Sequence, residues 1–194
     1  MATRDVRDTL QVYLQDVARA YDSAQHEPCN PLVARCYRAL MWELWQQFTV
    51  LRAFTRVTFT NVDPYGNSRE MHESIDHGSL SVYRTADLPV DHPFSALAPN
   101  GETYNSVFRA VHDGFAHYPE RLGFGMVGEF RAYLAHTRLL TFDASRALFT
   151  ETCGQNAWYH CGPRPKTYAP QIATLLPTSL IARASRLGDD YATT

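Results

Sequence analysis

The stretch from residue 107 to residue 136, VFRAVHDGFAHYPERLGFGMVGEFRAYLAH, decides how the rest of the chain is interpreted. Its two halves are predicted to form helices over residues 105–117 and 126–139, joined by the short connection YPERLGFG. The stretch packs three histidines, one aspartate and two glutamates into thirty residues. It therefore predicts a pair of helices whose polar side chains either converge on a metal ion or face water.

The flanking segments predict further helices and a little β structure. Spacings of three and four between apolar residues, alternating patterns and prolines define the expected elements. These are two helices at 4–24 and 32–53, two short strands in RVTFTNV and GSLSVYRT with a helix at 69–77 between them, a helix from TFDASRALF to about Gln155, and a short helix in the tail. The predicted fold is mainly α, a compact helical bundle with a small two-stranded β element, either a hairpin or a two-stranded sheet.

The length of 194 residues suits one domain. Within it we expect an N-terminal helical hairpin over 1–55, a strand and loop region over 56–100, a metal-binding helical core over 101–177 and a C-terminal tail over 178–194. These boundaries follow the predicted elements and the loops that separate them.

Composition and charge restrict the function. The net charge is −2 and no basic run occurs, so nucleic-acid binding is not expected. The chain has no run of eighteen apolar residues and no signal-peptide pattern at its start, so we expect a cytoplasmic protein that does not span a membrane and acts on a small molecule. The four cysteines form no C-x-x-C pair and are expected to be small buried residues. The oligomeric state is not determined by the sequence.

His112 and His117 are the first candidate ligands, and their spacing is unusual. Five residues of a regular helix rotate by about 500°, which leaves the two side chains roughly 140° apart. The pair can share one ion only if the helix is locally wound differently or if His112 lies at a helix edge. This spacing differs from H-E-x-x-H, where two histidines four apart share a face.

The local sequence VHDGFAH resembles the H-D/E-x-F/L-G-H motif of the aromatic amino acid hydroxylases, with Ala116 where that family has glycine. The resemblance covers some seven residues. It implies that His112 and His117 bind ferrous iron and that a later glutamate completes a two-histidine, one-carboxylate site. Such a site leaves coordination positions open for dioxygen and substrate.

Two glutamates compete for the carboxylate position. Glu129 lies near the start of the second predicted helix, with His136 two turns later on the same face. Glu151 lies in the third helix, four residues before Gln155. Three consecutive helices could therefore present His112 and His117, Glu129 and His136, and Glu151 and Gln155 towards one another, as helical bundles do in metal sites.

The remaining candidate residues have secondary roles. We expect Asp113 to orient a histidine, His136 and Glu151 to act as acid or base or as further ligands, and Gln155 to contact substrate. Tyr65, Tyr104 and Asn105 lie on predicted loops and could line the mouth of a pocket, although Asn105 also suits the start of a helix at 106. The other histidines considered, His72, His77, His92 and His160, are expected in turns or at the surface.

A longer block, YNSVFRAVHDGFAH followed by FGMVGEFRAYLAH, ETCGQNAW and YAPQ, is similar to an uncharacterised family of bacteriophage and actinobacterial proteins. The similarity covers about residues 61–177. It implies that the block is a unit and assigns no activity to it.

Three functions follow as hypotheses. The first is a mononuclear non-haem iron oxygenase or hydroxylase that acts on an apolar or aromatic small molecule, with Fe(II) held by His112, His117 and Glu129 or Glu151. The second is a zinc- or two-metal-dependent hydrolase with Glu129 or Glu151 as general base. The third is a phage-type accessory or interaction protein whose polar cluster is structural. In that case the same residues form a solvated helix face or a buried hydrogen-bonded network without a metal.

Overall fold

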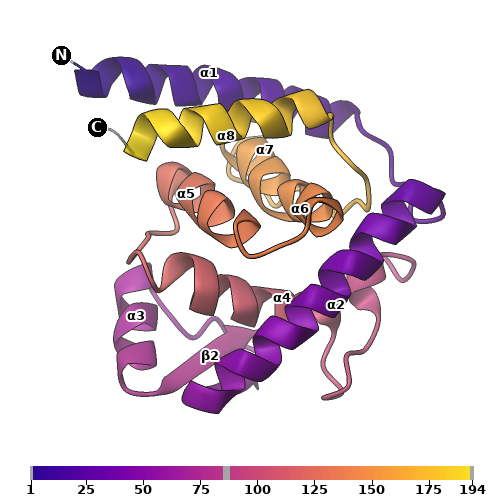
Figure 1. Cartoon of the computed structure of the whole chain (residues 1–194), viewed down its shortest axis with the longest axis vertical. Helices are drawn as coiled ribbons and strands as arrows, with labels where there is room; N and C mark the ends of the chain where they lie inside the picture. Colours follow the sequence, from indigo (N-terminus) through magenta and orange to yellow (C-terminus); the bar gives the residue numbers. More distant parts are fainter. Residues whose placement is uncertain (1, 85–87, 193–194) are drawn as a thin grey trace.

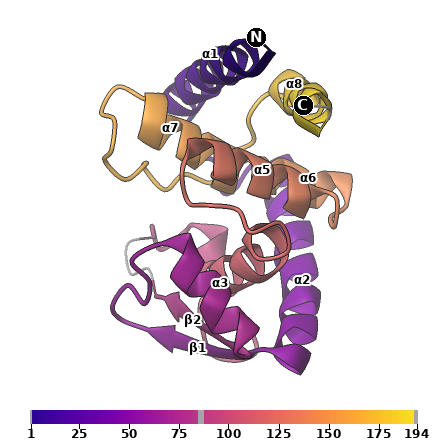
Figure 2. The same cartoon turned by 90° about the vertical axis from the view of Figure 1, so that its left-hand side faces the viewer.

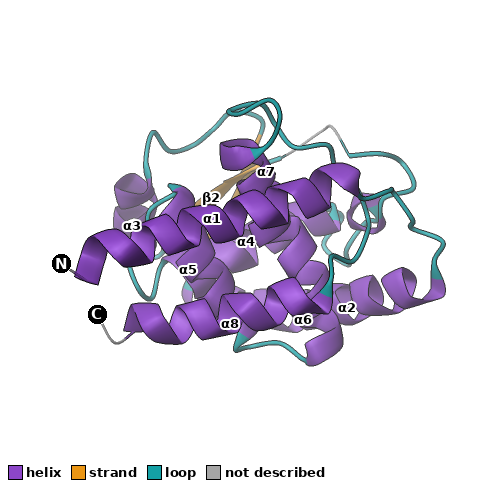
Figure 3. Ribbon diagram, turned by 90° about the horizontal axis from the view of Figure 1, so that it is seen from above, coloured by secondary structure: helices purple, strands orange, loops and turns teal. Residues whose placement is uncertain are grey.

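The computed structural model describes residues 2–84 and 88–192, with side chains described over 8–84 and 88–189. The described chain is mainly helical with a small two-stranded sheet, as predicted (Figure 3). In chain order the elements are α1 (Ala2–Ser23), α2 (Pro31–Phe54), β1 (Arg56–Thr60), α3 (Ser68–Asp76), β2 (Ser79–Tyr83), the 3-10 turn η1 (Pro93–Ser95), α4 (Tyr104–His112), the π-helical turn η2 (Asp113–His117), α5 (Met126–Thr137), α6 (Phe142–Phe149), the π-helical turn η3 (Thr150–Gly154), α7 (Gln155–Cys161) and α8 (Thr178–Ala192).

The helices are arranged in layers. Helices α1 and α8 lie side by side at one end of the molecule, with both chain termini on the same side (Figures 1 and 3). Helices α5, α6 and α7 lie beneath them, and α4, α3 and the sheet form the opposite end (Figure 2). Helix α2 runs along one side and packs against both α6 and α4. The apolar core between these layers includes the fully buried Tyr13, Leu40, Phe94, Phe149 and Trp158.

The two N-terminal helices have different main partners. Asn30 caps α2 by accepting a hydrogen bond from the Leu32 amide, and Pro31 occupies the first helical position, where it costs no backbone hydrogen bond. Helix α1 then packs mainly against α7, whereas α2 packs mainly against α6. The segment predicted as a helical hairpin is therefore spread over two sides of the bundle, and its two helices are held by later parts of the chain.

The small sheet is parallel, so the hairpin considered as one alternative is wrong. Strands β1 and β2 pair in register from Arg56 opposite Ser79 to Thr60 opposite Tyr83. Helix α3 carries the chain back between the two strands, and parallel strands need a crossover of this kind. The helix predicted at 69–77 is confirmed as this crossover.

Two helical segments contain a π turn. Helix α4 continues into η2, where the Tyr118 amide donates to the Asp113 carbonyl five residues earlier. Helix α6 continues through η3 into α7, where the Gln155 amide donates to the Thr150 carbonyl in the same manner. These turns carry Asp113, His117 and Glu151, and His112 and Gln155 lie next to them.

Glycines allow both π turns to pack closely against neighbouring helices. A Cβ atom on Gly114 would lie 2.6 Å from a methyl carbon of Leu51 in α2, and one on Gly154 would lie 2.8 Å from the ring of Tyr21 in α1. Both distances are far shorter than a normal contact between carbon atoms. Across the part of the chain that the structure describes, no helix is long and apolar enough to cross a membrane.

Candidate metal centre and a second buried polar cluster

The π turn η2 brings His112 and His117 to the same face of their helix. Its wider winding offsets the divergence of roughly 140° that a regular helix would impose on residues five apart. The two imidazole rings lie with their centroids 4.9 Å apart and nearly perpendicular. Both side chains are buried, with exposed fractions of 9% for His112 and 1% for His117.

Glu129 faces this histidine pair from the first turn of α5, which packs against η2. Its Oε2 atom lies 3.5 Å from Nε2 of His117 and 3.8 Å from Nε2 of His112. Gly128 sets the position of this turn, because a Cβ atom there would lie 1.9 Å from the carbonyl oxygen of Gly123. The connection between η2 and α5 thus folds back tightly enough to place a carboxylate opposite the two imidazoles.

The three facing atoms form a group that could hold a metal ion. One ligand atom from each of His112, His117 and Glu129 lies within 4.8 Å of the others. His117 has its Nδ1 atom 3.3 Å from the Leu122 carbonyl, which can only accept, so the Nδ1 atom of the neutral ring carries the proton and Nε2 offers a lone pair. The Nε2 atom of His112 is buried and has no hydrogen-bond partner among the described residues. Two imidazole nitrogens and a carboxylate oxygen therefore face one another around a position that suits a cation.

The same geometry perturbs the pKa values of all three groups. Burial raises the pKa of the Glu129 carboxyl, but His112 and His117 outweigh that effect and hold it well below its ordinary value. Burial lowers the pKa of His117, yet Glu129 and Asp113 bring it above its usual 6.5. For His112 burial prevails over Glu129, and its pKa is lowered. The carboxylate is thus ionised, and His112 is the more readily neutral of the two histidines.

His136 and Asp113 lie around the group. His136 is fully buried behind His112, with its Nδ1 atom 3.1 Å from Nδ1 of His112 and its Nε2 atom 2.9 Å from Oε1 of Gln47. Both of its ring nitrogens therefore face partners other than the candidate ion. Asp113 is half-buried within η2, and burial raises its pKa against the nearby charges of His117 and Arg109.

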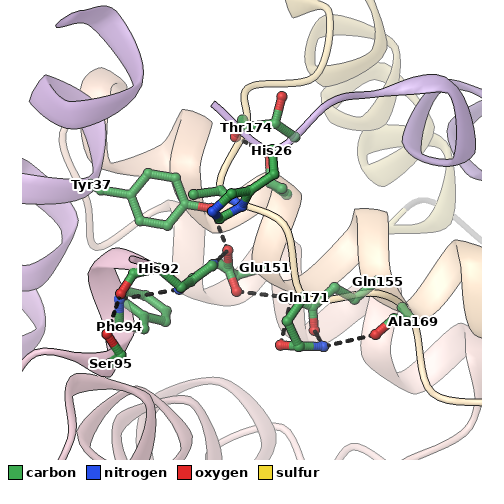
Figure 4. Close-up of polar contacts among 12 residues, drawn as sticks. His26, Tyr37, His92, Phe94, Ser95, Glu151, Gln155, Ala169, Gln171 and Thr174 are labelled. Atoms are coloured by element: carbon green, nitrogen blue, oxygen red, sulfur yellow. Dashed lines mark hydrogen bonds and ion pairs between the residues drawn. The ribbon is translucent and has the colours of Figure 1, made fainter. Parts of the chain in front are cut away.

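Glu151 lies in a separate buried cluster, which Figure 4 shows. Its carboxylate is 1% exposed and accepts hydrogen bonds from the hydroxyl of Tyr37 and from the amide nitrogen of Gln155, the latter at 2.8 Å. Nε2 of His92 lies 3.4 Å from the same carboxylate, and Gln171 faces Gln155. The structure thus places Glu129, and not Glu151, beside the histidine pair.

In the second cluster, donor groups point towards the carboxylate, whereas in the first the neutral histidines turn unprotonated nitrogens towards it. The backbone amide of Phe94 donates to Nδ1 of His92 at 3.1 Å, so the Nε2 atom of the neutral ring carries the proton and faces Glu151. Tyr37 and Gln155 donate hydrogen bonds to this carboxylate, whereas the N–H of His92 points towards it at 3.4 Å without making a hydrogen bond to any described residue. A metal ion there would have to displace two donors, so the cluster has the pattern of a buried hydrogen-bonded network.

The residues predicted to bind substrate are distributed over several parts of the molecule. The Tyr65 hydroxyl accepts a hydrogen bond from the Ser81 amide at 2.8 Å and so ties its loop to β2. Tyr104 and Asn105 begin α4, about 10–12 Å along the helix axis from His112. The cap of that helix is Thr103, so the prediction that Asn105 caps a helix starting at 106 is wrong by two residues. Gln155 belongs to the Glu151 cluster.

Two aromatic side chains flank the site. The ring of Phe108 lies 5.6 Å from that of His112, and the ring of Phe124 lies 5.2 Å from that of His117. Three further aromatic residues in the neighbouring sequence have partners elsewhere: Phe115 faces Phe54, Phe130 faces Tyr13, and Trp158 donates to Asp22.

Several expectations about single residues need correction. His72 is buried within α3, at 5% exposure, and lies neither in a turn nor at the surface. His92 lies in the turn before η1, as expected, but is buried, at 1% exposure. His77 is exposed and His160 is half-buried. The four cysteines are free, but only Cys36 and Cys153 are fully buried. Sequence reasoning also missed Tyr37 and Gln47, because an ordinary tyrosine and glutamine in an amphipathic helix carry no signal that they approach polar groups from distant segments.

Comparison of the chain with protein-family models, with curated proteins and with solved structures finds no match.

Proposed function

We propose that this chain is a metal-dependent enzyme with one divalent transition-metal ion held by His112, His117 and Glu129. The observation that carries the proposal is the convergence of two imidazole nitrogens and one carboxylate oxygen within 4.8 Å, with both nitrogens available as lone-pair donors. Three acceptor atoms facing one another in a largely buried site repel one another unless a cation or a proton lies between them. A two-histidine, one-carboxylate set is typical of non-haem Fe(II) oxygenases, so iron is the first choice of metal.

The proposed chemistry is oxygenation or hydroxylation of an apolar or aromatic small molecule. Iron bound by three protein ligands would supply the chemistry of dioxygen activation at its open positions. The chain's own contribution is access and exclusion of water. Glu129 has the most exposed of the three ligand side chains, at 21%, and Phe124 beside His117 is 42% exposed, so an apolar group stands at the accessible side of the site. The resemblance of HDGFAH to the hydroxylase motif supports the same assignment.

A hydrolase is the second candidate, because two histidines and a glutamate also hold catalytic zinc. In that case an open position would carry a water molecule that the ion activates. Glu151, considered as its general base, is instead surrounded by donors in the second cluster, so the proposal favours oxygenation over hydrolysis.

The test is to load the purified chain with ferrous iron without oxygen, to measure bound iron, and to add nitric oxide as a stand-in for dioxygen. We expect one iron per chain and the paramagnetic signal of a high-spin iron–nitrosyl adduct. Glu151→Gln is the matched control, since it changes a buried glutamate on the other π turn and should leave both results unchanged. Zinc retention without an iron–nitrosyl signal would favour the hydrolase, and a failure to retain any metal would favour a structural cluster.

A further inference from the structure

A chain of hydrogen bonds runs from the backbone to His112 through two residues that do not face the candidate ion. The amide nitrogen of Gln47 in α2 donates to the Leu139 carbonyl at 3.2 Å. The amide oxygen of Gln47 lies 2.9 Å from Nε2 of His136, and Nδ1 of His136 lies 3.1 Å from Nδ1 of His112. These hydrogen bonds thus join α2, the end of α5 and the last turn of α4.

The direction of every proton in this chain follows from one fixed point. The Leu139 carbonyl can only accept, so it holds the Gln47 amide with its nitrogen towards Leu139 and its oxygen towards His136. That oxygen can only accept, so Nε2 of His136 carries the proton. Nδ1 of the neutral His136 ring is then an acceptor, and Nδ1 of His112 donates to it.

The last link leaves Nε2 of His112 without a proton. It is this buried nitrogen that faces Glu129 and has no hydrogen-bond partner among the residues that the structure describes. If the Gln47 amide were turned around, every proton in the chain would reverse and Nε2 of His112 would carry hydrogen. An imidazole in that form cannot bind a metal through Nε2.

We propose that Gln47 and His136 are positioning residues that lock His112 in its metal-binding tautomer. This inference rests on the proposed metal centre and adds how one ligand is prepared for the ion before it arrives. It also assigns His136 a role different from ligand or acid–base group, because both of its ring nitrogens belong to the chain. His117 reaches the same tautomer by a shorter route, through the Leu122 carbonyl of its own connection.

The first test needs no metal. Nitrogen-15 NMR of the metal-free parent, with the His112 signals assigned by their loss in His112→Gln, should show the proton on Nδ1 of His112 and on Nε2 of His136. In Gln47→Met, which keeps the length of the side chain and removes both hydrogen bonds, His112 should become a mixture of tautomers. A proton on Nε2 of His112 in the parent would overturn the proposal without any variant having to fold.

The second test measures affinity for Co²⁺, whose visible spectrum reports binding. Gln47→Met should weaken binding by about 10- to 100-fold, the usual effect of removing a group that orients a ligand. Gln47→Glu keeps an acceptor facing His136 and should retain most of the affinity. A merely space-filling role for Gln47 would explain that retention but not the loss in Gln47→Met, which fills the same space. Gln155→Met, at the half-buried glutamine of the Glu151 cluster, is the matched control and should bind as the parent does.

The outcomes separate this proposal from the proposed function. A parent that binds no metal but shows the expected tautomers keeps the positioning chain and overturns the metal centre. If the parent and Gln47→Met bind cobalt with equal affinity and both show a single His112 tautomer, the metal centre is kept and the positioning role of Gln47 and His136 is overturned.

Discussion

The two π turns of this protein hold two buried carboxylate clusters that differ in the direction of their protons. In the first, the neutral rings of His112 and His117 turn unprotonated nitrogens towards Glu129, so that acceptor faces acceptor until a cation or a proton lies between them. In the second, Tyr37 and Gln155 donate hydrogen bonds to Glu151, so that donor faces acceptor. The residue types are similar in the two clusters, yet only the first has the electrostatic pattern of a cation site.

The difference shows that a count of histidines and carboxylates does not identify a metal site. Each histidine has one ring nitrogen towards the cluster and one towards another partner. That other partner determines the tautomer, and therefore whether the nitrogen that faces the cluster carries a proton. A backbone carbonyl beside Nδ1 of His117 directs its Nε2 lone pair to the group, whereas a backbone amide beside Nδ1 of His92 directs an N–H to Glu151. Backbone groups of neighbouring segments thus divide two similar clusters into a candidate binding site and a structural network.

The largest expected effect separates the two clusters by metal affinity. Glu129→Gln removes the charged ligand and should weaken binding of Co²⁺ or Zn²⁺ by at least about 100-fold, or roughly 2.7 kcal/mol. Glu151→Gln should bind as the parent does, since its carboxylate belongs to another cluster. Competition with a chelator of known affinity measures both variants. Equal losses in the two would show that the clusters act as one site, and a loss in Glu151→Gln alone would move the site to the second π turn.

The second effect concerns stability, and we expect it in the second cluster and not in the first. Tyr37→Phe removes a donor from a buried carboxylate and should lower the free energy of unfolding by about 1.5–3 kcal/mol, as expected for a hydrogen bond to a charged group. Denaturant unfolding of the metal-free chain measures it. The affinity for metal should stay unchanged, and an altered affinity would contradict the separation of the two clusters.

The third effect compares two glycines that allow close packing. Gly128→Ala places a methyl group against a backbone carbonyl that cannot move aside, so the first turn of α5 shifts together with Glu129. We expect metal affinity to fall by roughly tenfold, or about 1.4 kcal/mol. Gly154→Ala meets the side chain of Tyr21 instead and should cost about 1–3 kcal/mol of stability with little change in affinity. Metal titration and denaturant unfolding give the affinity and the free energy of unfolding of both variants. A loss of affinity in Gly128→Ala and a loss of stability in Gly154→Ala would support the comparison, and a loss of affinity in Gly154→Ala alone would contradict it.

The smallest effect is a pH dependence that His117 of the first cluster contributes just above pH 6.5. The pKa of His117 is raised above 6.5 in the folded chain, so its proton stabilises the metal-free fold fully below pH 6.5. That stabilisation is lost as the pH rises from 6.5 through the raised pKa. The lowered pKa values of His112 and His136 act in the other window, where stability is lost as the pH falls below 6.5.

Unfolding of the metal-free chain between pH 6.5 and about 8 tests this effect, because the buried thiols, whose pKa values burial raises, add a decline of their own only at higher pH. The free energy of unfolding should decline with rising pH in the parent and in Glu151→Gln. His117→Gln should remove the decline. If His117→Gln keeps it, the group responsible lies outside the first cluster.

Much of the fold follows from local patterns. The helices other than α7, the crossover α3 and both strands were predictable because each has its own periodicity, caps or turn residues. Helix α7 runs to Cys161, beyond the predicted end at about Gln155. The parallel pairing of β1 and β2 was not, because it depends on where α3 returns the chain. The separate packing of α1 and α2 also depends on α6 and α7, more than a hundred residues later in the sequence.

By itself, the sequence determined the mainly α fold and named His112, His117 and Glu129 among its candidate ligands. Only the tertiary structure decided that the two histidines share a face and that Glu129 faces them while Glu151 does not. The physical reason is that both outcomes depend on hydrogen bonds and packing between distant segments. The close approach of Leu51 to Gly114 packs α2 against the π turn. Backbone carbonyl or amide groups beside His117 and His92 determine the tautomers of these histidines. Residue spacing along one helix contains no information about either.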